Sequence, residues 1–115
     1  GADYPACTGV TPRFCGGNIQ GIIERLDYIQ GMGFECIWIT PPVKQYASDS
    51  CHYVDGKKWC SDGFSGYWAE NFFEIDPHFG TREDLAELTA NLHARKMCLV
   101  LDMVTNHAGI IESEE

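Results

Sequence analysis

Two short apolar runs constrain the possible folds of this chain more than any other feature. Residues 34–40 and residues 97–104 are rich in β-branched, aromatic and long aliphatic side chains, and each run follows a segment with helical periodicity. Such runs are typical of strands that are buried on both faces of a parallel sheet. Helices that alternate with buried strands predict a parallel β/α architecture.

Helical periodicity is visible before each run. Across residues 19–29, apolar side chains recur every three or four positions, which predicts one amphipathic helix with Asn18 as its N-cap and Gly31 near its end. Leucines at helical spacing across residues 85–92 predict a second helix. Its start at Thr81–Asp84 resembles a capping box, with Asp in the place usually held by Glu.

Two strands alone cannot form a parallel sheet with protected edges, because each would leave a row of backbone groups unpaired. A doubly wound sheet or a (β/α)8 barrel needs further strands, and a barrel takes about 250 residues. Since the chain has 115 residues, we expect it to be part of a larger domain. The polar residues 43–66 between the two strands are predicted to be a long loop, and loops of that length are usually functional.

The charge of the chain excludes some partners. Its 17 acidic and 8 basic residues give a net charge of −9. Because an acidic surface repels phosphate groups, neither nucleic acid nor an anionic membrane is expected to bind. No apolar run approaches the roughly 20 residues needed to span a bilayer. A neutral ligand such as a sugar is compatible with this charge.

The chain has six cysteines, a high number for its length. Cys7 and Cys15 lie close together in sequence, as do Cys51 and Cys60, and both pairs fall in polar, turn-rich segments. Such pairs indicate disulfide-closed loops in a secreted protein and a metal site in a cytosolic one. Their spacing exceeds the roughly two to four residues of a zinc ribbon, which favours disulfides. A small zinc or redox module is the weakest interpretation, and the pairing stays open.

The residues best suited to chemistry gather around the second strand. Asp102 lies near its carboxyl end, where barrel enzymes build their active sites, and a buried carboxylate is costly unless it is paired. Asn106 offers an amide oxygen suited to Ca²⁺, and His107 can hydrogen-bond a sugar hydroxyl or move a proton. Tyr67 and Trp68 offer rings on which a sugar can stack. Each residue also has a purely structural interpretation. Asp102 would be a paired buried carboxylate, Asn106 and His107 would be ordinary loop residues, and Tyr67 and Trp68 would be core aromatics.

Together, these segments resemble the α-amylase family, most closely its secreted fungal members. Residues 102–107 match the D-x-V-x-N-H motif that ends the third barrel strand of that family. The agreement continues upstream in the family's order and spacing and covers the chain from about Cys7 to His107. It rests on the segments 15–23, 26–34, 37–41, 66–68 and 76–81.

The resemblance implies a (β/α)8 TIM barrel, domain A, with a small domain B inserted after its third strand. Residues 34–40 would be strand two and residues 97–104 strand three, with their helices and a long loop. Residues 1–115 would then be the N-terminal segment of the catalytic barrel and would stop where domain B begins. The remainder of the amylase chain would be the partner that completes the barrel.

The family hydrolyses internal α-1,4-glucosidic bonds of starch and maltooligosaccharides with retention. Its nucleophile, acid/base and third carboxylate lie on strands four, five and seven, so no residue of this chain is assigned those roles. The resemblance implies that Asp102 supports the site through an arginine that is not in this chain. Tyr67 would stack on the glucose before the cleaved bond, His107 would hydrogen-bond it, and Trp68 would pack beside them. Asn106 would bind Ca²⁺.

The resemblance also bears on the cysteines and on localisation. Cys7 and Cys15 match a pair that is bonded in fungal members, and a bond is also expected between Cys51 and Cys60, in a loop that is longer than usual for the family. Cys36 and Cys98 have no counterpart partner and are predicted to be buried thiols. The protein is expected to be secreted and extracellular.

Alternatives to the α-amylase interpretation stay open. An α-glucanotransferase or an α-glucosidase shares the same fold, and transfer would yield longer maltooligosaccharides. The 115 residues alone are expected to be inactive, as a non-catalytic fragment or a sugar-binding remnant, because the catalytic carboxylates are absent from the chain.

Overall fold

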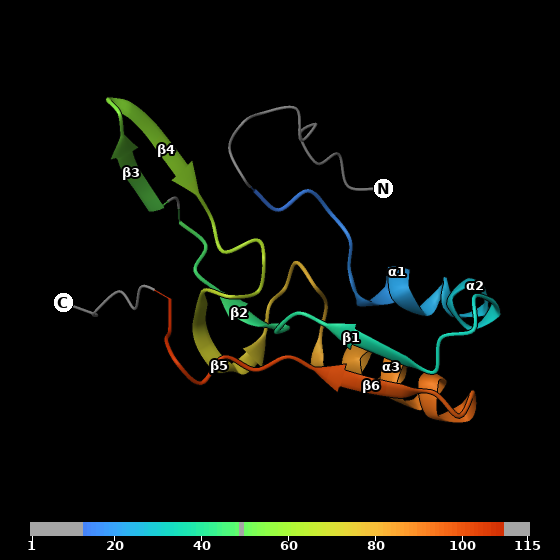
Figure 1. Ribbon diagram of the computed structural model, residues 1–115. Helices are drawn as coiled ribbons and strands as arrows, with labels where there is room; N and C mark the ends of the chain where they lie inside the picture. Colours follow the sequence, from blue (N-terminus) through green and yellow to red (C-terminus); the bar gives the residue numbers. More distant parts are fainter. Residues whose placement is uncertain (1–12, 49, 110–115) are drawn as a thin grey trace.

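The computed structural model describes residues 13–48 and 50–109. These residues form three separate two-stranded sheets and three helices, with the helices on one side of the parallel sheet (Figure 1). In chain order the elements are α1 (Ile19–Ile23), α2 (Leu26–Gly31), β1 (Cys36–Ile39), β2 (Val43–Gln45), β3 (Ser50–Val54), β4 (Lys57–Ser61), β5 (Ala69–Ile75), α3 (Arg82–Ala94) and β6 (Cys98–Leu101). In this part of the chain, the helices are too short or too polar to cross a membrane.

The predicted first helix is divided in two. Asn18 is its N-cap, as predicted, and its side chain accepts a 2.8 Å hydrogen bond from the Gly21 N–H. The backbone then tightens at Arg25, whose N–H donates to the Ile22 carbonyl rather than to the carbonyl four residues back. The apolar stripe nevertheless keeps its direction across the break, because Ile19 in α1 and Leu26 in α2 are both buried.

The two predicted strands form the expected parallel pair, β1 with β6. Helices pack on one face of this pair, and α3 lies behind the two strands in Figure 1. Between the layers lies a core to which Ile37 of β1 and Leu99 of β6 contribute. The buried members of this core are Ile19, Leu26, Leu88, Leu92 and Met97. The Thr81–Asp84 capping box is present at the start of α3, as predicted.

The opposite face of the β1–β6 pair is exposed in the described part of the chain, so the prediction of burial on both faces is wrong there. Trp38, which lies in the run 34–40 that was predicted to be buried, is 72% exposed, and its partner Val100 is 47% exposed. Side chains alternate between the faces of a strand, so both point away from the helices. In a closed barrel this face is turned to the interior.

Cys36 and Cys98 are not buried thiols, which corrects the prediction. The parallel register places them directly opposite each other, with Cα atoms 4.4 Å apart, and they form a disulfide. Both residues lie on the exposed face. Both residues were predicted to lie on the two neighbouring strands, but the sequence did not predict the register that sets them opposite each other across a separation of 62 residues.

The predicted long loop contains regular structure, which is a second correction. β2 pairs antiparallel with β5, and β3 pairs antiparallel with β4 to form a hairpin that projects from the rest of the molecule (Figure 1). Its turn is Asp55–Gly56, with φ angles of 50° and 72°, and this dipeptide is typical of a tight hairpin turn. Cys51 and Cys60 face each other across the ladder and form the expected disulfide.

Candidate functional site

Asp102 lies one residue beyond β6, at the carboxyl end of the parallel pair. Its N–H donates a 3.2 Å hydrogen bond to the carbonyl of Ile39, which extends the ladder past the strand. Its carboxylate Oδ2 accepts a 2.6 Å hydrogen bond from the hydroxyl of Tyr67, and both side chains are half-buried. The structure therefore joins two residues that the sequence separates by 35 positions.

The hydrogen bond to Asp102 raises the pKa of Tyr67 above its ordinary value, with smaller contributions from burial and from the negative charge of the carboxylate. Each effect opposes loss of the phenolic proton, because a phenolate could not donate to Asp102 and would face its charge. The phenol therefore keeps its proton at neutral pH. The result is a fixed aromatic ring with its hydroxyl turned to the strand end.

His107 is the third member of the cluster. Its Nε2 lies 2.9 Å from the carbonyl oxygen of Tyr67. A carbonyl oxygen can only accept, so this hydrogen bond assigns the proton to Nε2. In the neutral ring, Nδ1 is then left as an acceptor on an exposed side chain. Such an atom can receive a hydrogen bond from a ligand hydroxyl.

Trp68 is anchored beside this cluster. Its N–H donates a 2.8 Å hydrogen bond to Gln45 Oε1, and its carbonyl accepts one of 2.9 Å from the N–H of Tyr46. Gly109 packs so closely that a Cβ there would lie 2.7 Å from the Trp68 carbonyl oxygen. A cavity of about 280 Å³ opens here, lined by Ser50, Trp68, His107, Ala108 and Gly109.

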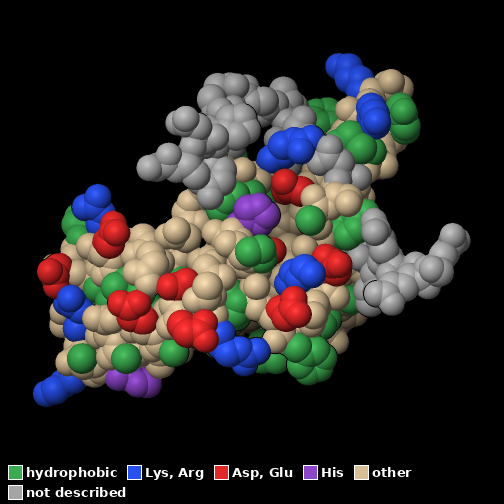
Figure 2. All heavy atoms as spheres, turned by 180° about the vertical axis from the view of Figure 1, so that it is seen from behind, with side chains coloured by type: hydrophobic (Ala, Val, Ile, Leu, Met, Phe, Trp, Pro, Cys, Tyr) green, Lys and Arg blue, Asp and Glu red, His purple; other side chains and the backbone are tan. Residues whose placement is uncertain are grey.

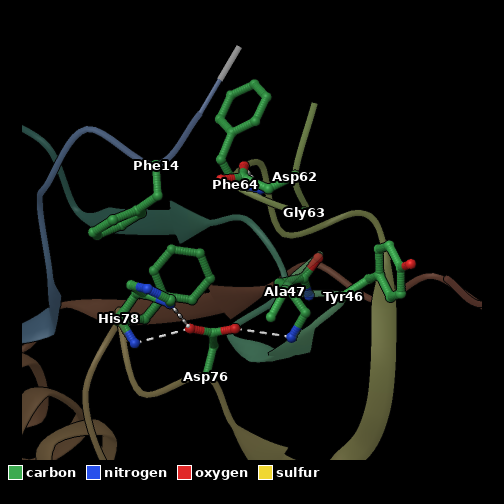
Figure 3. A pocket seen from close by; sticks show the side chains of 10 residues that line it. Phe14, Tyr46, Ala47, Asp62, Gly63, Phe64, Asp76 and His78 are labelled. Atoms are coloured by element: carbon green, nitrogen blue, oxygen red, sulfur yellow. Dashed lines mark hydrogen bonds and ion pairs between the residues drawn. The ribbon is translucent and has the colours of Figure 1, made fainter. Parts of the chain in front are cut away.

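A buried polar chain, which the sequence interpretation missed, holds this region in place. Asp76 is 4% exposed and Gln45 is 5% exposed. Asp76 Oδ2 accepts from the Gln45 N–H at 2.8 Å, and its Oδ1 accepts from the His78 N–H at 2.8 Å and lies 2.9 Å from His78 Nδ1 (Figure 3). Gln45 in turn holds Trp68. In the sequence, residues 76–81 were a signal only as part of the family resemblance, which assigned Asp76 no structural role.

The backbone before Tyr67 needs a glycine. Gly66 has a φ of +90°, and a Cβ there would lie 2.7 Å from the carbonyl oxygen of Pro41. A side chain would therefore collide with the segment that follows β1. This close contact sets the loop carrying Tyr67 against the carboxyl end of the parallel pair.

Asn106 is not part of this cluster. Its side chain is exposed, and it can offer one amide oxygen to a cation. Calcium takes about six to eight oxygen ligands, and the described residues contain no group of three or more His, Cys, Asp or Glu that could hold a metal. The described residues can therefore supply one ligand to a calcium site, the amide oxygen of Asn106, but not the whole site.

The remaining predicted site residues are four cysteines. Cys15 is disulfide-bonded, whereas Cys7 lies outside the described residues, so their predicted pairing stays a prediction. Cys51 and Cys60, by contrast, are joined as described above.

Comparison with known proteins gives consistent matches. The family model "Alpha amylase, catalytic domain" matches residues 4–114. Alpha-amylase mde5 of Schizosaccharomyces pombe is 43% identical over 103 residues, which cover 90% of this chain and 18% of that protein. Alpha-amylase 2 of Schwanniomyces occidentalis is 42% identical over 107 residues, covering 93% and 20%. The chain thus spans about a fifth of the length of these relatives.

Solved structures show the same similarity. An α-amylase from Malbranchea cinnamomea superimposes with a TM-score of 0.72 at 44% identity, over 85% of this chain and 19% of that one. An α-amylase from Geobacillus thermoleovorans, solved in complex with acarbose, gives 0.65 at 42% identity, over 82% and 18%. A cyclomaltodextrin glucanotransferase gives 0.72 at 33% identity, over 82% and 18%.

Proposed function

Because the chain belongs to the α-amylase catalytic-domain family, we propose that it supplies part of the substrate cleft of a retaining glycoside hydrolase that cleaves internal α-1,4 bonds of starch. The chain corresponds to part of a TIM barrel, and no closed barrel is present among its described residues. The observation that carries the proposal is the contact of Tyr67, Asp102 and His107 at the carboxyl ends of two parallel strands. In barrel enzymes this end carries the chemistry.

The cluster is suited to a neutral sugar. The ring of Tyr67 would stack on the C–H face of the glucose unit before the scissile bond, and the hydrogen bond to Asp102 prevents the ring from turning away. The free Nδ1 of His107 would accept a hydrogen bond from a hydroxyl of the same unit. Since both groups are held before the substrate arrives, little conformational freedom is lost on binding.

Asp102 is a positioning residue in this proposal, not a nucleophile. Its carboxylate is already engaged by the Tyr67 hydroxyl, and retaining hydrolysis needs two carboxyl groups that flank the bond, about 5 Å apart. We assign those groups to the parts of the barrel beyond this chain. The 115 residues alone would therefore bind sugar without cleaving it.

We also propose that Asn106 contributes an oxygen to a bound Ca²⁺, which would tie this segment to the rest of the protein without taking part in proton transfer. Secretion is part of the same proposal. Its support is the disulfide content of the described residues, Cys36–Cys98 and Cys51–Cys60, because disulfides persist in oxidising compartments.

The test is the variant His107→Ala in the complete polypeptide that carries this chain, with maltoheptaose as substrate. We expect kcat/KM to fall about 10- to 100-fold, the effect of losing one or two hydrogen bonds in the transition state. The control is His93→Ala, which removes an exposed imidazole on α3 and leaves the cluster intact. Full activity of His107→Ala would refute the site.

The products separate two activities within the family. The similarity to a cyclomaltodextrin glucanotransferase makes transfer the second candidate. Hydrolysis of maltoheptaose yields only shorter chains, whereas transfer also yields longer or cyclic ones.

A further inference from the structure

The β3–β4 hairpin offers an exposed surface that the proposed function does not use. Its ladder is crosslinked by the Cys51–Cys60 disulfide. Seen from behind in Figure 2, the hairpin projects at the upper right and carries hydrophobic and basic side chains. A crosslinked ribbon loses little conformational freedom when a ligand binds, so it suits the presentation of a rigid surface.

The hairpin has two faces with different side chains. Side chains alternate along a strand, and residues paired across an antiparallel ladder share a face. His52 and its partner Trp59 therefore lie on one face, whereas Tyr53 and its partner Lys58 lie on the other. We call the first the Trp59 face; it comprises Ser50, His52, Val54, Lys57, Trp59 and Ser61.

The Trp59 face is continuous with the candidate site. Ser50, at its base, lines the cavity of about 280 Å³ together with Trp68 and His107. Since an antiparallel strand rises about 3.4 Å per residue, the His52–Trp59 pair lies about 7 Å farther along the hairpin than Ser50. This step is comparable to the length of a sugar ring. A glucan bound at His107 would reach this face at Ser50, which belongs to both the cavity lining and the hairpin.

We propose that the Trp59 face is a further glucan-binding subsite, which takes units of the chain beyond the one held at Tyr67 and His107. The proposal rests on the proposed function and extends it. The Trp59 side chain is 37% exposed, so part of the indole is open for stacking on an apolar sugar face, and its partner His52 can hydrogen-bond hydroxyls. No charge is required of the ligand. The subsite selects long glucans over short ones.

The experiment compares Trp59→Ala with Tyr53→Ala in the complete polypeptide that carries this chain. The two variants remove aromatic rings from opposite faces of one hairpin, and Tyr53 is the more exposed at 72%. The readout is the ratio of the KM for maltoheptaose to the KM for maltotriose. In Trp59→Ala we expect this ratio to rise about 3- to 10-fold, the effect of one lost aromatic contact. In Tyr53→Ala we expect no change.

A second measurement is the unfolding temperature of each variant. If the Trp59 face instead covers another part of the protein, Trp59→Ala lowers the unfolding temperature and leaves the KM ratio unchanged, which overturns the proposal. Equal KM ratios in both variants overturn it as well. If the unmodified protein cleaves neither substrate and its tryptophan fluorescence does not respond to maltoheptaose, the proposed function fails. If it cleaves both and the ratio is insensitive to Trp59, only the subsite fails.

Discussion

Different forces hold together two regions of the molecule. One is the parallel unit, which consists of β1, β6 and their helices, and the other is the antiparallel region from β2 to β5. The parallel unit has an apolar core that includes Leu88 and Leu92, neither of which is exposed. The antiparallel region instead depends on buried polar groups at Asp76 and Gln45 and on a local disulfide. Apolar burial leaves a periodic pattern in the sequence, whereas a polar network does not.

The largest expected effect tests the crosslinks of the two regions. The Cys36–Cys98 pair spans 62 residues and the Cys51–Cys60 pair spans 9. Closing a longer loop removes more entropy from the unfolded chain. We therefore expect that replacing both cysteines of the first pair by serine lowers the free energy of unfolding by about 4 kcal/mol. The same change in the second pair should cost about 2.5 kcal/mol. Urea unfolding measures both, and an equal or larger loss in the hairpin variant would contradict this prediction.

A smaller effect is expected from the polar chain of the antiparallel region. Asp76→Ala leaves the N–H groups of Gln45 and His78 without their acceptor, which should cost about 2–3 kcal/mol of unfolding free energy. Glu74→Ala is the control, because its 3.8 Å ion pair with Lys44 is exposed and should be worth less than about 0.5 kcal/mol. Thermal or urea unfolding compares the two variants. Similar losses would show that the buried chain is not what holds this region.

The smallest effect concerns the contact that joins the two regions at Tyr67 and Asp102. Because folding raises the pKa of Tyr67, the hydrogen bond of its hydroxyl stabilises the fold fully below the ordinary tyrosine pKa of 10.0. This stabilisation is lost as the pH rises through the raised pKa. Tyr67→Phe lacks this titration, so its unfolding free energy should fall less steeply than that of the unmodified protein at alkaline pH. Urea unfolding across the alkaline range measures both slopes. Parallel curves would show that this hydrogen bond makes no such contribution.

The elements with periodic patterns were predicted from the sequence. The N-cap at Asn18, the capping box at Thr81–Asp84 and the parallel strands all follow from local residue choice, and the structure contains them. The hairpin was missed although its Asp55–Gly56 turn was visible. Its strands show only a weak alternation of apolar and polar residues, because most of their side chains are exposed on both faces.

The candidate site was predicted in part. Its residues were singled out by type and by position near a strand end, but their contacts were not. The partner of Asp102 among the described residues is the Tyr67 hydroxyl, whereas the family resemblance pointed to an arginine. The resemblance placed Tyr67 and His107 at the same glucose unit, but it did not predict the hydrogen bond of His107 with the Tyr67 carbonyl or the support from Asp76. Such contacts join residues that are distant in sequence or involve backbone atoms, which residue types do not encode.

The sequence by itself determined where the helices and parallel strands form and which side chains are available for binding sugar, because apolar periodicity and capping residues act over a few positions. The tertiary structure alone decided the strand register and the side-chain contacts between residues that are distant in sequence. It placed Cys36 opposite Cys98, turned Trp38 away from the helices and brought Tyr67 to Asp102. These outcomes depend on strand register, and register arises only when the whole chain packs.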